Sequence, residues 1–189
     1  MVHGALKNRY LRNKVRVNLE NNQLKKSKVI IRLRAHYFKD SVSCSGNQLS
    51  EILQCIKGGS IELDWYIFDM YGSTGLSLYK LFPNYTNPFV KDEQKICMFN
   101  HMNELISSVK QIHQFESGVF IGIKKNENVV WDMRHLPETE EDEGIQHPLG
   151  LVEIRLFDCS YIEIYGTDIY LIELLKNKFK ISDNDLINQ

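Results

Sequence analysis

Three carboxylates in this 189-residue sequence are of the type that could carry hydrolytic chemistry: Asp64, Asp69 and Glu93. Paired carboxylates bind Mg²⁺ and serve as general acids and bases in nucleases and phosphoesterases. The alternation of a predicted strand places Asp64 and Asp69 on opposite faces, however, and Glu93 with Lys95 falls at a predicted helix start rather than on a strand. A metal-dependent nuclease or phosphoesterase-like enzyme that uses these three residues is therefore an alternative and not the leading interpretation.

A second group is predicted on a long helix from Asp92 to about His113. Cys97, His101 and Glu104 follow at i, i+4 and i+7, so they would share one helix face and could contribute to a metal site. The same spacing continues the apolar stripe of that helix, and the sequence lacks a paired motif such as HExxH. The four cysteines are scattered without CxxC, which favours reduced thiols. We predict no metal site, no cofactor and no catalytic residue.

The densest charged feature is the run from Glu138 to Glu143, with five carboxylates in six residues. The chain has 23 Lys+Arg and 24 Asp+Glu, but residues 1–40 carry 11 basic and two acidic residues, a net of +9, which leaves −10 for the remainder. A negative surface accelerates association with a basic partner. We predict a partner-binding surface made of Asp132, Glu138, Glu140, Glu141, Asp142, Glu143 and Glu163.

The basic residues 1–40 suggest a second alternative. With Tyr10 and Tyr37 available for stacking, they could follow a phosphate backbone, as in a nucleic-acid-binding accessory protein. The cations are dispersed, no helix-turn-helix or RNP pattern is present, and the acidic remainder would repel nucleic acid. Nucleic acid is therefore a less favoured partner than a protein.

Composition sets the class of protein. Hydrophobic residues make up 43% of the chain and aromatic residues 11%, which excludes wholesale disorder. No apolar run approaches the roughly 18 residues that cross a bilayer, and the basic start lacks the apolar region of a secretory signal. We expect a cytoplasmic protein without a membrane partner. We divide it into a basic arm at 1–27, one domain at 28–181 and a frayed tail at 182–189.

Hydrophobic periodicity predicts how the domain is built. The predicted strands are 14–19, 28–38, 61–71, 76–82, 118–124, 128–133, 150–157 and 160–165. One helix is predicted between Ser45 and Gly58, and two more at 92–113 and 168–179. A turn is expected at Gly72–Gly75 and a polar loop at 134–148. Helices and strands without strict alternation predict an α+β fold, with a mostly antiparallel sheet and two or three helices packed on one face.

The stretch VEIRLFDCSYIEIYGTD, from Val152 to Asp168, is followed by LIELL at Leu171–Leu175. This order resembles the strand, Phe-Asp-x-Ser-Tyr, strand, helix ending of small bacterial proteins that are similar to immunity proteins of polymorphic toxin systems. The resemblance implies a non-catalytic inhibitor that binds and blocks a cognate toxin. The leading hypothesis is an immunity-type inhibitor that neutralises a basic toxin, such as a nuclease, through an acidic face.

Overall fold

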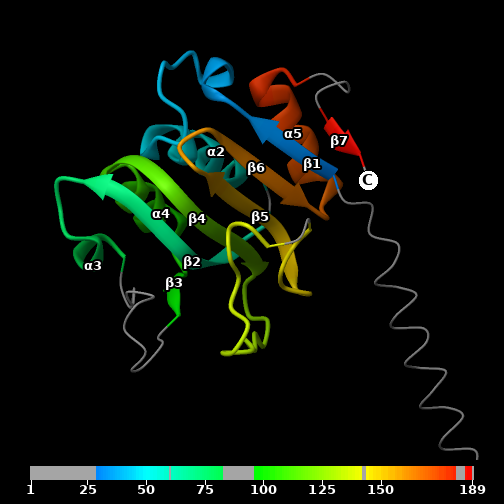
Figure 1. The fold of residues 1–189 in the computed structure, drawn as a ribbon. Coiled ribbons are helices and arrows are strands. Elements are labelled where there is room, and N and C mark those ends of the chain that lie inside the picture. Colours follow the sequence, from blue (N-terminus) through cyan, green and yellow to red (C-terminus); the bar gives the residue numbers. More distant parts are fainter. Residues whose placement is uncertain (1–28, 60, 83–95, 142–143, 182–185, 189) are drawn as a thin grey trace, which may run out of the picture.

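The computed structural model describes residues 29–59, 61–82, 96–141, 144–181 and 186–188. Seven strands form one antiparallel sheet in the order β3-β2-β4-β5-β6-β1-β7 (Figure 1). The strands are β1 (Val29–Leu33), β2 (Leu63–Thr74), β3 (Cys97–Phe99), β4 (Ile112–Lys124), β5 (Gly150–Phe157), β6 (Tyr161–Gly166) and β7 (Leu186–Asn188). The helices are the 3-10 helix η1 (Ala35–Phe38), α2 (Gly46–Lys57), α3 (Leu78–Leu81), α4 (Met102–Val109) and α5 (Ile169–Phe179).

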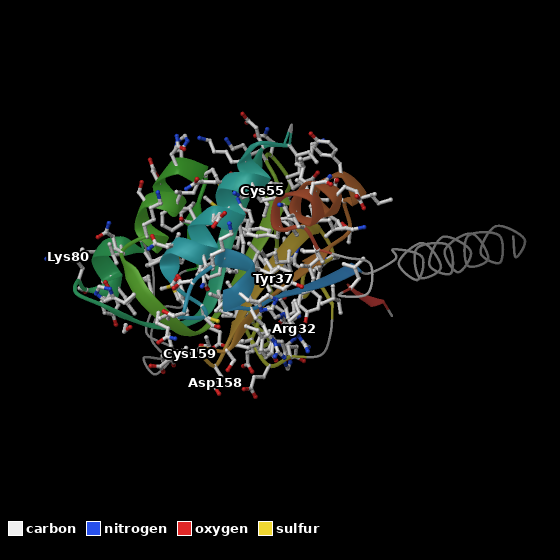
Figure 2. All side chains as sticks on the ribbon, turned by 90° about the horizontal axis from the view of Figure 1, so that it is seen from above. Arg32, Tyr37, Cys55, Lys80, Asp158 and Cys159 are labelled. Atoms are coloured by element: carbon white, nitrogen blue, oxygen red, sulfur yellow. The ribbon has the colours of Figure 1, made fainter. Side chains whose placement is uncertain are left out.

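The helices α2, α4 and α5 cover one face of the sheet. Their buried side chains, among them Leu49, Leu105 and Leu175, form one core with Trp65 and Ile154 from the strands. Cys55 lies where α2 meets α5, and its thiol is 3.6 Å from the carbonyl of Leu174. Figure 2 shows Cys55 on the helix side of the sheet and Arg32 and Asp158 on the opposite side. The α+β fold with helices on one face is therefore confirmed. In the described part of the chain, no helix combines the length and apolarity that crossing a membrane requires.

The start of α2 shows how local sequence sets an element. Ser45 accepts a hydrogen bond from the backbone N–H of Gln48, and the Gln48 side chain accepts one from the N–H of Ser45, each at 3.3 Å. This capping box satisfies donors that the first turn leaves unpaired. The stripe of Leu49, Ile52 and Ile56 is buried as predicted.

Substitution of Gly46 is expected to destabilise the fold. A methyl group there would lie 1.9 Å from the backbone oxygen of Val109 and 2.5 Å from that of Ile112. Because backbone must move to relieve this clash, Gly46→Ala should lower the free energy of unfolding by about 2–3 kcal/mol in chemical denaturation. Gly75→Ala is the control, since its new methyl would meet only His113 at 4.0 Å. Equal stabilities for the two variants would contradict this packing.

The predicted long helix at 92–113 is wrong. Cys97–Phe99 form β3 and pair with Trp65–Ile67 of β2, α4 covers only Met102–Val109, and β4 already begins at Ile112. Apolar residues from all three elements enter the same core, so their spacing imitates one helical stripe although the chain turns twice. Residues 92–95 of that predicted helix lie outside the described residues.

Several other predictions need correction. Leu76–Phe82 contains the short helix α3 rather than a strand, 128–133 is loop, and β1 ends at Leu33 before η1. The residues of the expected turn at Gly72–Gly75 mostly continue β2, which bends there through irregular pairing with β4. Leu186–Asn188, in the segment expected to fray, pair with β1 as β7. The predicted strand at 14–19 lies outside the described residues.

Candidate partner-binding site

Residues 125–149, which connect β4 to β5, form the segment called here the acidic loop. It holds seven acidic and two basic residues, a net of −5. Its described part, 125–141 and 144–149, contains neither helix nor strand. Connections of this length without regular structure are uncommon in compact domains and are usually functional or disordered. Contacts with the sheet give this loop a fixed conformation.

An apolar contact fixes the first half of the loop. The ring of Trp131 lies 4.6 Å from that of Phe68 and 5.3 Å from that of Tyr66, both on β2. Phe68 belongs to a small core on the sheet face opposite the helices, with Val119, Ile121 and Ile123 of β4. Val129, Leu136 and Leu149 from the loop also pack against this core. The loop thus covers a second apolar surface of the sheet.

His147 joins the two halves of the loop. Its ring lies 4.3 Å from Trp131, and the backbone N–H of Leu149 donates to its Nδ1 at 3.2 Å. Nδ1 is thereby an acceptor, so in the neutral ring Nε2 carries the proton and donates to the carbonyl of Val130, also at 3.2 Å. Burial lowers the pKa of His147 below its ordinary value.

This lowered pKa predicts a pH-dependent loss of stability. In the unfolded state His147 takes up a proton near pH 6.5, whereas in the folded state it does so only at a lower pH. The neutral His147 therefore contributes its full stabilisation of the fold above pH 6.5. This contribution is lost as the pH falls through the folded-state pKa. An NMR titration of the imidazole should give a pKa below 6.5. In His147→Gln this part of the pH dependence of the unfolding free energy should disappear. A pKa at or above 6.5 would contradict the described contacts.

A buried arginine fixes the second half of the loop. Arg155 points from β5 into the face opposite the helices and has no exposed side-chain surface. Its Nε donates to Glu153 at 2.6 Å, its Nη1 donates to the carbonyl of Glu141 at 2.8 Å, and its Nη2 donates to the carbonyl of Gly144. One guanidinium therefore ties the acidic run directly to the sheet.

Gln146 and Glu153 complete this anchor. Glu153 is fully buried and accepts hydrogen bonds from the Gln146 backbone N–H at 2.7 Å and side-chain amide at 2.9 Å. The Gln146 side-chain oxygen also accepts a hydrogen bond from the backbone N–H of Glu138, and the Gln146 side-chain NH₂ donates one to the carbonyl of Glu138, each at 2.9 Å. Burial raises the pKa of Glu153, while Arg155 and Gln146 favour its ionised form. The anchor therefore consists of groups that are costly to bury unless they are paired.

Asp69 supplies a third anchor from β2. Its carboxylate accepts the backbone N–H of Thr139 at 2.8 Å, and the Thr139 hydroxyl accepts the N–H of Gly118 at 3.1 Å. Asp69 has φ 46° and lies where the pairing of β2 with β4 shifts register, which turns its side chain toward the loop. A carboxylate considered for metal chemistry thus holds the loop, while Asp64 is in register with Ile123 and Glu93 lies outside the described residues.

The outer side of the acidic loop presents carboxylates to solvent. Asp132, Glu138, Glu140 and Glu141 are exposed. Arg134 donates to Asp132 at 3.0 Å from its backbone and 3.2 Å from its side chain, and these bonds hold the pKa of Asp132 below its ordinary value. Asp142 and Glu143 lie outside the described residues. Two apolar side chains also face outward, with Val130 74% and Met133 43% exposed.

Glu163 does not join this exposed surface. It is buried on β6, accepts a hydrogen bond from Arg32 Nε at 2.7 Å and another from the hydroxyl of Tyr165. Arg32 also stacks over the ring of Tyr161 at 4.7 Å. The face of β1 that carries Arg32 is therefore largely covered, since Ile30 on the same face is buried too. Residues 1–28 of the basic arm lie outside the described residues.

The residues considered for a metal site are distributed over different elements. Cys97 is in β3, His101 precedes α4 and Glu104 lies in its first turn. Among the described residues there is no group of three or more His, Cys, Asp or Glu side chains that could hold a metal ion. All four cysteines are free thiols, and burial raises the pKa of Cys44 and Cys97 to about 12.

No family model, curated protein or solved structure matches this chain. The geometry of the acidic loop therefore carries the functional conclusion. Sequence reasoning identified the exposed carboxylates but missed their anchors, Arg155, Glu153 and Gln146. The sequence does contain a sign of two of these anchors, because Glu153 and Arg155 are the charged residues in the otherwise apolar strand Gly150–Phe157.

Proposed function

We propose that this protein is a non-catalytic binding module whose acidic loop docks onto a basic surface of a partner protein. The supporting observation is that the buried Arg155 and the partly buried Asp69 of the sheet fix the loop backbone, while Glu138, Glu140 and Glu141 are exposed. A loop that is already ordered loses less conformational entropy on binding than a flexible one. Its charge accelerates the encounter with a partner of opposite sign.

The partner proposed is a bacterial toxin, and the chain an immunity-type inhibitor in the same cytoplasm. The resemblance of residues 152–175 to immunity proteins supports this assignment. A basic toxin such as a nuclease binds phosphates with a positive surface, and a rigid row of carboxylates complements such a surface. The exposed Val130 and Met133 supply apolar contact area beside the charges.

Co-expression tests this function. Toxin domains encoded beside this chain are expressed with the wild-type protein, with Glu138→Lys/Glu140→Lys/Glu141→Lys, or with Glu104→Lys/Glu116→Lys/Glu173→Lys. Both triple variants change the net charge equally, and all six positions are exposed. Growth should be rescued by the wild type and the second variant but not by the first. Failure of the wild type to protect against any such domain would refute the toxin-inhibitor assignment, and equal protection by both variants would refute the role of the loop.

A further inference from the structure

A cavity of about 450 Å³ lies at the end of the sheet where β2 begins, and no carboxylate of the acidic loop lines it. Its walls come from the end of α2, the start of β2, the turn between β3 and α4, and the first residue after β4. This size falls within the range of small-molecule sites. Four segments that are distant in sequence therefore meet around one hollow.

The polar wall of the cavity carries two cations, Lys57 and Lys125. Lys57 at the end of α2 donates to the side-chain oxygen of Asn103 at 2.6 Å. Lys125 lies 3.3 Å from Glu62, and its side chain is only 30% exposed. The Glu62 side chain is 80% exposed, so it can turn into water when a stronger anion approaches Lys125. His101 and Asn100 add hydrogen-bonding groups to the same wall.

The remaining wall is apolar. Ile61, Leu63 and Met102 line the cavity, and Ile61 and Met102 are half-buried. A bare inorganic anion would leave this surface unused. A ligand with an anionic end and a small organic body would satisfy both walls, as typical pockets combine a few polar groups with apolar lining.

We propose that this cavity binds a small phosphomonoester. The phosphate lies between Lys57 and Lys125 with the Asn103 amide nearby, and the organic group lies against Ile61, Leu63 and Met102. Two ammonium groups match the charge of a phosphate dianion, and charge-assisted hydrogen bonds to phosphate are the strong kind. Of the acidic loop, only its first residue, Lys125, lines this site, and the proposal does not depend on the partner that the loop is proposed to bind.

NMR titration of the full chain with phenyl phosphate and with inorganic phosphate, at constant ionic strength, tests the site. The backbone amides of Gly59 and Asn103 should shift saturably, and phenyl phosphate should bind more tightly than phosphate. Lys57→Met and Lys125→Met should each weaken binding about tenfold or more, as expected for loss of one hydrogen bond between charged groups. Lys110→Met, exposed at the other end of α4, is the matched control and should bind as the wild type does.

Residue-specific shifts separate this site from binding by the basic residues 1–28. Shifts confined to those residues, or no saturable shift, would overturn the proposal. So would equal affinity of the wild type and Lys57→Met. Equal affinity for phenyl phosphate and phosphate would overturn the assignment of the apolar wall.

Discussion

Arg155→Met is expected to lower the free energy of unfolding by about 3–5 kcal/mol, the usual cost of removing one member of a buried ion pair. The substitution leaves Glu153 buried without its charged partner and removes the donors to the carbonyls of Glu141 and Gly144. Chemical denaturation followed by circular dichroism measures the loss. A decrease smaller than about 1 kcal/mol would contradict the anchor described here.

Two further variants separate the anchor from general effects of losing an arginine. Arg134 lies in the same loop but its side chain is 84% exposed, so Arg134→Met should change stability by no more than about 0.5 kcal/mol. Adding Glu153→Gln to Arg155→Met should recover part of the loss, since a neutral amide is cheaper to bury than an unpaired carboxylate. Additive losses in the double variant would show that the two side chains do not interact.

Reversing the loop charges should slow association with the partner much more than it alters folding. In Glu138→Lys/Glu140→Lys/Glu141→Lys, the association rate constant with the proposed partner toxin should fall at least about tenfold at low ionic strength. These side chains are exposed, and the anchoring bonds in this stretch use backbone groups of Glu138 and Glu141. Surface plasmon resonance measures the rate, and circular dichroism checks the fold.

The matched variant Glu104→Lys/Glu116→Lys/Glu173→Lys should slow association far less, because its changes lie on α4, β4 and α5 rather than on the loop. The difference between the two variants should shrink as salt is added, since screening weakens interactions between exposed charges. Identical rate constants for both variants would show that only net charge matters.

The parts of the fold that could be predicted are those whose signals are local. The hairpin β5–β6 and the helix α5 could be predicted because the alternation of the two strands, their tight turn and the apolar stripe of the helix lie within 30 consecutive residues. The helix α2 could be predicted for the same reason, since Ser45 precedes its apolar stripe and Gly58 ends it. The region 92–113 failed because β3, α4 and β4 share an apolar spacing that does not reveal where the chain turns.

In the acidic loop, too, the features with local sequence signals could be predicted and those that depend on distant contacts could not. The carboxylates at 138–143 are consecutive in sequence, so their charge was predictable. Their fixed backbone was not, because it depends on Arg155 reaching Glu141 and on Asp69 reaching Thr139, which lies 70 positions along the chain. Glu163 was expected on the exposed acidic surface, but it is buried and paired with Arg32. Its pairing could not be predicted, because Arg32 lies far from it in the sequence.

The most direct test of the acidic loop as the docking surface is carboxylate footprinting by carbodiimide labelling and mass spectrometry, with and without the proposed partner toxin. Binding should protect Glu138, Glu140 and Glu141 from labelling and leave Glu104, Glu116 and Glu173 as reactive as in the free chain. Protection of the second group with unchanged labelling of the first would place the interface elsewhere and contradict the account.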